Sequence, residues 1–435
     1  MRRVALSGLL GTAVEFYDFL VYGTVAALVF GDLFFPAADP AAGTLAAFGT
    51  FAAGYVARPL GGIVFGHFGD RLGRKSMMLL TMTVMGCGSF LIGVLPTYGT
   101  IGVWAPTLLI ALRVVQGIAI GGEWGGATLM VVEHAEHTRS PRRGLWSGLT
   151  QLGAPLGSVL SAGTVTLVSA LPDDQFRAWG WRVPFLLSIV LPATGLFVRR
   201  KIAESPLFAR ARREPAARPP LVEVLRRPGP VLLAACAGIG AFTAQSLLTG
   251  FMISYAVDHG YARPQVLGAV TVASCVALLV LPAASALSDR VGRRPVILAG
   301  AIASAALAFP VLALVDSGSP GLLILALVLG HGLAQSTMYG PLGALLTELF
   351  GTRVRYTGAS LGYQAATLAG AGFSPLIAGS LVASSGGSGT PVALLLCGGA
   401  AVTALAVWRL RETRTAALDP TTHRTAAPAP EGTPR

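Results

Sequence analysis

Twelve long apolar stretches run through the sequence, and they restrict the chain to folds built inside a membrane. Each stretch has about 18–27 residues, enough for a helix to cross a hydrocarbon core of ~30 Å at ~1.5 Å per residue. Backbone groups find no water in a bilayer core, so we expect each stretch to be helical. The predicted spans are 7–30, 45–69, 75–95, 104–132, 144–170, 182–199, 230–257, 264–288, 295–315, 320–347, 356–384 and 390–409.

The composition excludes most alternatives to a helical membrane protein. Hydrophobic residues make up 53% of the chain and charged residues 12%, against roughly 45–50% and 25% in soluble domains. Outer-membrane strands alternate in hydrophobicity over about ten residues, and these stretches do not. The sequence shows no phosphate-binding loop, metal cluster or nucleophile–base pair in context, so we expect neither an enzyme nor a bound cofactor.

A basic turn of similar sequence occurs once in each half of the chain. Gly66–Lys75 reads GHFGDRLGRK, and Ser285–Arg294 repeats it as SALSDRVGRR. Their aspartates, Asp70 and Asp289, lie half a chain apart, and each turn separates two predicted spans. This arrangement is typical of a duplicated membrane bundle. We therefore expect an all-α membrane protein with 12 transmembrane helices in two six-helix bundles.

The basic residues indicate how the chain is oriented. They cluster before the first span and after every second span, whereas Arg177, Arg182 and Arg263 fall on the other side. Basic loops stay in the cytoplasm, so both termini and the central loop are predicted to be cytoplasmic in a multi-pass protein of the cell membrane. The net charge of +12 is therefore not a sign of nucleic-acid binding, which uses one continuous basic face.

The chain is expected to divide into four parts. The central linker is rich in Arg and Pro, and the C-terminal tail repeats Thr, Ala and Pro, which is typical of disorder. The first span is too long for a cleavable signal and should remain as an anchor. The four cysteines fall in different spans and are interpreted as small apolar core residues. The expected parts are the N-terminal bundle 1–200, the cytoplasmic linker 201–229, the C-terminal bundle 230–411 and a disordered cytoplasmic tail 412–435.

Charged side chains at membrane depth mark the expected site. A charge at mid-bilayer costs at least ~2.5–3.5 kcal/mol, so such residues are usually functional. Static ion pairs, above all Arg58 with Asp18, are one interpretation. Three acids against two bases leave one carboxylate without a basic partner, and in low dielectric such a group can take up and release a proton. The charged residues at depth are Glu15, Asp18, Arg58, Arg113 and Glu123.

The sequence resembles the metabolite:proton symporters of the major facilitator superfamily from about residue 7 to 411. Among these, the first half is most similar to carriers of shikimate and related organic acids; the family also carries proline, betaine, 2-oxoglutarate and citrate. The resemblance implies two bundles that rock around a central cavity, driven by the proton gradient and functional as a monomer. It rests on Glu15-Phe-Tyr-Asp18-Phe, Arg58-Pro-Leu-Gly-Gly62, the Gly66–Lys75 turn, Arg113-Val-Val-Gln-Gly117, Gly121-Gly-Glu123-Trp-Gly-Gly126 and Gly180-Trp-Arg-Val-Pro-Phe185.

The resemblance also implies a latch at the two turns. Asp70 would cap the N-terminus of a helix in the C-terminal half, where a carboxylate is favoured. Arg74 would pair with Glu133 at the inner end of the fourth span. The second turn has Ser285 in place of Gly66, so we expect it to pack more loosely. The expected gating residues are Gly66, Asp70, Arg71, Gly73, Arg74, Glu133, Asp289, Arg290 and Arg293.

The substrate is expected to be an anion or a zwitterion. A guanidinium grips a carboxylate with two hydrogen bonds. If Arg58 is committed to Asp18, Arg113 remains for a monocarboxylate, such as a shikimate-like hydroxy acid. Proton coupling is assigned to Glu15 or Glu123, with Asp18 as the paired neighbour. Substrate binding is assigned to Arg58, Arg113, Gln116, Gln245, His331, Gln335 and Tyr363.

Two other functions remain open. Gly153-Ala-Pro-Leu-Gly157 partly resembles a motif of drug–proton antiporters, which would make the chain an exporter of a drug or pathway product. A membrane sensor that transports nothing would need a folded soluble domain, and the 201–229 linker is too short for one. The leading prediction is a proton-coupled importer of a small organic acid or zwitterion.

Overall fold

The computed structural model describes residues 2–36, 40–136, 142–200 and 220–416, and all secondary structure in these ranges is helical. Eleven helical stretches within them are long and apolar enough to cross a membrane. The remaining predicted span, 45–69, lies inside the 33-residue helix α3 (Pro40–Leu72). Every predicted span is therefore matched by a helix, and the predicted all-α class is confirmed.

The N-terminal half contains six long helical stretches and several short helices. The order is α1 (Arg2–Val25), η1 (Ala26–Phe30), α2 (Gly31–Phe34), α3 (Pro40–Leu72), α4 (Arg74–Val94), α5 (Tyr98–Ile101), α6 (Trp104–Glu136), α7 (Arg143–Gln151), α8 (Gly153–Val168), α9 (Asp173–Ala178), η2 (Gly180–Arg182), α10 (Val183–Leu187) and α11 (Val190–Arg200).

The C-terminal half repeats this plan, with π-helical turns (η3, η4 and η5) inside three of its spans. The order is α13 (Pro220–Arg226), α14 (Pro228–Ser246), η3 (Leu247–Phe251), α15 (Met252–Asp258), α16 (Arg263–Val291), α17 (Arg293–Val315), α18 (Pro320–Leu327), η4 (Val328–Gln335), α19 (Ser336–Glu348), α20 (Arg355–Thr367), η5 (Leu368–Gly372), α21 (Ser374–Ser384) and α22 (Thr390–Arg409).

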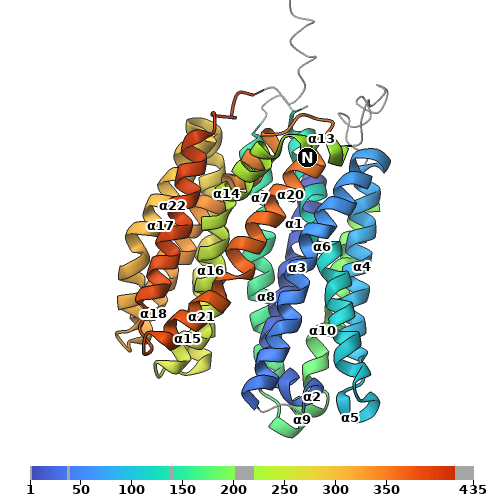
Figure 1. Ribbon diagram of the computed structural model, residues 1–435, viewed down its shortest axis with the longest axis vertical. Coiled ribbons are helices and arrows are strands. Elements are labelled where there is room, and N and C mark those ends of the chain that lie inside the picture. The colour runs from blue at the N-terminus through green and yellow to red at the C-terminus, as the bar shows by residue number, and fades with distance from the viewer. Residues whose placement is uncertain (1, 37–39, 137–141, 201–219, 417–435) are drawn as a thin grey trace, which may run out of the picture.

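The two bundles stand side by side, with the N-terminal half in blue and green and the C-terminal half in yellow and red (Figure 1). The N-terminus and α13 lie at one end, which we call the basic end; α5, α9, α15 and α18 lie at the other, the distal end (Figure 1). Helix α20 packs on α3 and α6, and α7 packs on α16 and α19. These helices join the two halves.

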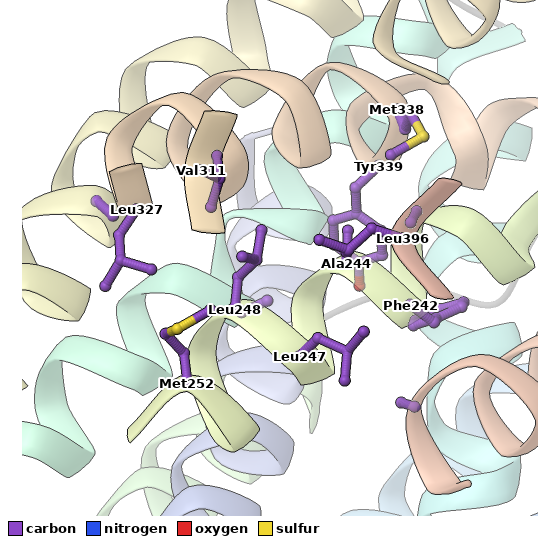
Figure 2. Close-up of a cluster of buried hydrophobic side chains, with 14 of the residues drawn as sticks. Phe242, Ala244, Leu247, Leu248, Met252, Val311, Leu327, Met338, Tyr339 and Leu396 are labelled. Atoms are coloured by element: carbon purple, nitrogen blue, oxygen red, sulfur yellow. The ribbon is translucent and has the colours of Figure 1, made fainter. Parts of the chain in front are cut away.

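The largest buried apolar cluster lies mainly in the C-terminal half and includes Tyr55, Trp124 and Ala154 of the N-terminal half. In the C-terminal half, Phe242, Leu248 and Met252 from one span meet Val311, Leu327 and Met338 from neighbouring helices (Figure 2). In the N-terminal half, aromatic rings from η1, α2, η2 and α10 pack against one another in a compact cluster. These cores hold the helices on which the polar site is built.

Glycines bring helix backbones together where the polar residues lie. A Cβ at Gly61 would collide with the backbone of Ile118, and one at Gly121 would collide with the carbonyl of Arg58. Close approach through small residues is the usual way in which membrane helices pack. On α8, Gly153 and Gly157 likewise lie against the backbone of α1. The motif that resembled an antiporter sequence thus packs α8 within its own half.

The first residues of the expected tail have defined contacts. The Glu412 carboxylate accepts hydrogen bonds from the backbone N–H groups of Arg293 (2.9 Å) and Arg294 (3.1 Å), at the start of α17. The Thr413 hydroxyl donates to Glu348 at 2.6 Å. The prediction of disorder from residue 412 is therefore wrong for 412–416, because the open N–H groups of a helix N-terminus attract a carboxylate. Residues 201–219 and 417–435 lie outside the described ranges.

We expect the Glu412 contact to depend on pH. Partial burial acts to raise its pKa, but the N–H groups of Arg293, Arg414 and Arg294 outweigh burial and hold the pKa below the usual 4.5. A lowered pKa means that the contact stabilises the fold above pH 4.5 and is lost as the pH falls below it. Hydrogen exchange at the Arg293 and Arg294 amides, corrected for intrinsic rates, should therefore lose protection below that pH. Glu412→Ala should remove the pH step, and Glu223→Ala, an exposed acid on α13, should leave it unchanged.

Candidate functional site

The first element of the site is a buried ion pair between α1 and α3. An Arg58 guanidinium nitrogen lies 3.3 Å from a carboxylate oxygen of Glu15, and both side chains are almost fully buried. The guanidinium also lies over the rings of Tyr55 at 4.4 Å and Phe19 at 4.9 Å. The expected pair of Arg58 with Asp18 is wrong. Three residues turn a helix by about 300°, so Asp18 is rotated by ~60° from Glu15 and faces α4 instead.

Asp18 ends a chain of three hydrogen bonds that crosses from α6 through α4 to α1. Arg113 Nη1 donates to Gln116 Oε1 at 3.0 Å, and Gln116 Nε2 donates to Ser89 Oγ at 2.7 Å. The Ser89 hydroxyl donates to Asp18 Oδ2 at 2.5 Å. All four side chains are buried. Within the described ranges, the second oxygen, Asp18 Oδ1, has no hydrogen-bond partner.

The guanidinium of Arg113 is held in place by contacts with neighbouring side chains. Its guanidinium lies 3.6 Å from the centre of the Tyr22 ring, and the Tyr22 hydroxyl is hydrogen-bonded to Thr50. The prediction that Arg113 remains for the substrate assumed a pair of Arg58 with Asp18, whereas Arg58 pairs with Glu15. An aromatic face and an amide stabilise the buried guanidinium of Arg113 in this structure. Its hydrogen bond to Gln116 and its contact with Tyr22 both involve neutral groups.

The environment of Glu123 differs from those of Glu15 and Asp18. The Thr81 hydroxyl of α4 donates to its carboxylate at 2.6 Å, and both residues are buried. The three acids predicted for proton coupling are thus all placed inside the N-terminal bundle, but each faces a different partner.

Aromatic residues join the two halves next to this polar core. Trp124 of α6 stacks on Tyr363 of α20 with ring centres 3.7 Å apart. The Tyr363 hydroxyl is 3.1 Å from that of Tyr339, and the Trp124 indole donates to Gln151 at 3.1 Å. Sequence reasoning proposed Tyr363 but missed Trp124 and Tyr339, since a buried aromatic residue in a membrane helix is usually a packing residue.

The other predicted residues of the C-terminal half are spread over several helices. His331 and Gln335 are buried in η4, and neither His331 ring nitrogen has a hydrogen-bond partner in the described part of the chain. Gln245 in α14 is half-buried. Gln364 donates to the Gly121 carbonyl at 3.2 Å and so binds α20 to α6. No hydrogen bond or ion pair in the described ranges joins His331, Gln335 or Gln245 to the polar core of the N-terminal half.

The basic end is closed by the two repeated turns. Asp70 Oδ2 accepts hydrogen bonds from the backbone N–H (3.1 Å) and hydroxyl (2.8 Å) of Thr357, in the first turn of α20. Asp289 accepts from the N–H groups of Gly144 and Leu145, both at 2.8 Å, in the first turn of α7. Each turn thus caps a helix of the other half, as the resemblance implied for Asp70.

Buried ion pairs reinforce these caps. Glu133 lies 3.1 Å from Arg355, and Glu348 lies 3.2 Å from Arg293 and 3.4 Å from Arg143. Arg293 also pairs with Asp289 at 2.7 Å. Each glutamate therefore binds an arginine of the opposite half.

The remaining gating predictions had mixed outcomes. The side chain of Arg74 lies outside the described part of the structure, so its pairing with Glu133 stays a prediction. Arg71 and Arg290 are exposed. Gly66 lies against Thr357, and Gly73 has a φ of 115°, a value that glycine adopts readily.

The expected loose packing of the second turn is wrong. Ser285 is fully buried, and a Cβ on Gly148 or on Gly340 would collide with its hydroxyl oxygen. The serine side chain thus fills the space between α7 and α19.

Comparison with known proteins identifies the family. The sequence matches the Major Facilitator Superfamily over residues 8–361 and, in a second match, over 265–432. It is 40% identical over 421 residues to the shikimate transporter of Escherichia coli (strain K12), covering 95% of each chain. The chain belongs to the Major Facilitator Superfamily. The resemblance found in its motifs is therefore confirmed, and the chain is a transporter rather than an enzyme.

Other members of the superfamily extend this similarity. The proline/betaine transporter of Salmonella typhimurium (strain LT2) is 34% identical over 400 residues, which cover 88% of this chain and 78% of the relative. A solved proton:xylose symporter superposes with a TM-score of 0.73 at 16% identity, covering 95% of this chain and 97% of its own. That structure supports the superfamily fold of two bundles.

Proposed function

We propose that this transporter is a proton-coupled symporter that imports a small organic acid or zwitterion, with a shikimate-like monocarboxylate favoured. The relatives named above transport shikimate or proline and betaine, solutes that carry a carboxylate. The observation that carries the proposal is the pair of buried arginines in the N-terminal half. Moving an anion through low dielectric requires a fixed positive charge, and Arg58 and Arg113 supply two.

The two arginines have different roles in this proposal. Arg58 is neutralised by Glu15, so a substrate carboxylate would compete with an existing ion pair there. Arg113 donates to the neutral amide of Gln116, which a carboxylate can replace with a gain in hydrogen-bond strength. We therefore assign the substrate carboxylate to Arg113, and neutral recognition of hydroxyl groups to Tyr363, Gln335 and Gln245.

Asp18 is our choice for the residue that carries the proton. Glu15 is paired with Arg58, and the positive charge of that neighbour favours the charged form of Glu15 in this state. No basic side chain in the described ranges forms an ion pair with Asp18, and its partner is a hydroxyl. A hydroxyl can donate to a carboxylate or accept from a carboxylic acid, so this partner suits both protonation states.

The closed basic end defines the transport state. We infer that the basic end faces the cytoplasm, because basic loops are retained there. The hydrogen bonds and ion pairs between Asp70 and Thr357, and between Glu348 and Arg143, then close the inner side. Alternating access requires these contacts to break when the transporter opens inward. We propose that a single chain completes this cycle.

Uptake into proteoliposomes tests the function. Labelled shikimate, proline and betaine, and for comparison an uncharged and a cationic solute, would be offered with an inward proton gradient, without a gradient, and with an outward gradient. The symporter predicts accumulation of a carboxylate solute only with the inward gradient. Accumulation only with the outward gradient would instead show the antiport exporter. Failure to move any carboxylate solute, together with transport of an uncharged or cationic one, would contradict the proposed substrate class.

Arg113→Lys tests the assignment of the substrate carboxylate. Lysine keeps the charge but loses the two-pronged grip, and losing a charge-assisted hydrogen bond costs ~1.5–3 kcal/mol. We expect the apparent KM for the transported carboxylate to rise about tenfold or more, as the cost of that lost bond implies. Arg177→Lys, at an exposed ion pair near the distal end, should leave KM unchanged. An unchanged KM in Arg113→Lys would remove Arg113 from the substrate site.

A further inference from the structure

We propose that Ser89 is the positioning residue that holds the Asp18 carboxylate and connects it to the charge of Arg113. The inference deepens the proposed function, because it rests on Asp18 as the proton carrier and names the residue that sets when Asp18 is charged. Ser89 lies on α4, bears no charge and belongs to none of the motifs found in the sequence.

The three hydrogen bonds that connect Arg113 to Asp18 all run from donor to acceptor in the same direction. A guanidinium can only donate, so Arg113 must bond to the oxygen of Gln116. That contact turns the amide nitrogen of Gln116 toward Ser89, and an amide nitrogen also only donates. The Ser89 oxygen thereby accepts from Gln116 with one of its two lone pairs, and the Ser89 hydroxyl donates its own proton to Asp18 Oδ2. The positive charge of Arg113 thus fixes the direction of a hydrogen bond two residues away.

This direction favours the charged form of Asp18. A hydroxyl that donates to a carboxylate stabilises the anion, and bonds to charged groups are about twice as strong as neutral ones. The other oxygen, Asp18 Oδ1, has no hydrogen-bond partner among the described residues. Proton uptake at Oδ1, an atom buried from solvent in this closed state, would therefore leave the Ser89 contact unbroken.

Few other groups lie close enough to Asp18 to influence the charge of its carboxylate. Among the described residues, the Ser89 hydroxyl of α4 donates to the Asp18 carboxylate, and Gln116 connects that hydroxyl to Arg113 of α6. Helices α8 and α10 pack on α1 and have no ionisable side chain. On α3, Arg58 is paired with Glu15. On α6, Glu123 is bound by Thr81. The connection through Ser89 is therefore the hydrogen-bonded route from a base to this acid in the described structure.

The hydrogen bonds from Arg113 through Gln116 and Ser89 also couple substrate binding to the protonation of Asp18. A carboxylate that takes over the Nη1 hydrogen of Arg113 frees the oxygen of Gln116. The amide can then turn, and the Ser89 hydroxyl is no longer obliged to donate to Asp18. Asp18 then takes up a proton more readily, so anion and proton bind together, as symport requires.

Infrared spectroscopy of the purified full-length transporter tests the inference without any substrate. The carboxylic acid band of Asp18 is identified by its absence in Asp18→Asn and followed as a function of pH. In Ser89→Ala, the midpoint pH of this band should move upward by about one unit or more, a tenfold change in proton binding, since a charged hydrogen bond is lost. Ser89→Cys, whose thiol is a weaker donor, should fall between wild type and Ser89→Ala.

Two further variants make the result specific. Gln116→Leu cuts the connection to Arg113 but keeps the Ser89 contact, so it should move the midpoint in the same direction by a smaller amount. Ser274→Ala removes another buried serine hydroxyl, one with no hydrogen-bond partner in the described ranges, and should change nothing. An identical midpoint in wild type, Ser89→Cys and Ser89→Ala would overturn the inference. Because no solute is added, a failed uptake experiment would count against the proposed function and leave this result standing.

Discussion

Replacing Asp18 with asparagine is expected to abolish proton-driven accumulation of substrate while sparing exchange across the membrane. Asparagine keeps the size of the side chain and can still accept the hydrogen bond from Ser89, but it cannot bind a proton. Net uptake against a gradient requires proton release on each cycle, whereas exchange of labelled for unlabelled solute does not. Accumulation and exchange would be measured in the same proteoliposome preparation.

The controls separate Asp18 from the other acids. Asp258→Asn changes an exposed acid at the end of α15 and should accumulate substrate like wild type. Glu15→Gln leaves Arg58 buried without its counter-charge and should impair exchange as well as accumulation. If Asp18→Asn accumulates normally and Glu123→Gln does not, the proton is carried by Glu123 and our assignment is wrong.

Alanine at position 348 is expected to open the basic end. Glu348 lies between Arg143 of one half and Arg293 of the other, and also accepts the hydroxyl of Thr413. Removing one partner of a buried ion pair typically costs about 3–5 kcal/mol, because the remaining charge stays buried. That cost falls on the closed state, since opening lets both arginines reach water. The open state should therefore gain roughly a hundredfold or more in relative population.

Labelling of an introduced cysteine can measure this shift. Ser147 is fully buried and its hydroxyl lies against Gly343 of α19, so Ser147→Cys is shielded while the basic end is closed. In a background without the native cysteines, a water-soluble maleimide should label this site far faster when Glu348→Ala is added. Asp32→Ala, which breaks an exposed ion pair with Arg177, should have no effect, since such pairs contribute little. Equal labelling rates in all three proteins would show that Glu348 does not hold the end closed.

The sequence predicts the helices of this transporter well because their signal is spread over many residues. A hydrophobic run of some twenty residues tolerates errors at its ends, and the spans found at 264–288 and 390–409 agree with α16 and α22 to within a few positions. The repeated turns are equally clear, because their composition is unusual between apolar segments. Both features depend on pattern rather than on the direction of a single side chain.

Side-chain partners were harder to predict, and the reasons are geometric. Glu15 and Asp18 are three residues apart, so a small rotation of α1 decides which one meets Arg58. Ser89 is one serine in an apolar helix, and nothing in its neighbours distinguishes it before α4 is placed against α1 and α6. The same holds for Glu412, whose partners are backbone N–H groups and leave no trace in the sequence.

The arginines at the basic end serve the protein at two different times. In the proposed orientation, Arg143, Arg293 and Arg355 are hydrated charges while the chain is being inserted into the membrane, and they help to keep their loops on the cytoplasmic side. In the finished, closed bundle the same three side chains are almost completely dehydrated and bound to Glu133, Glu348 and Asp289. Lysine at these positions would therefore supply the positive charge needed for membrane insertion but would not replace the arginine contacts that close the basic end. Such a variant can be correctly inserted into the membrane and still be unable to close its basic end.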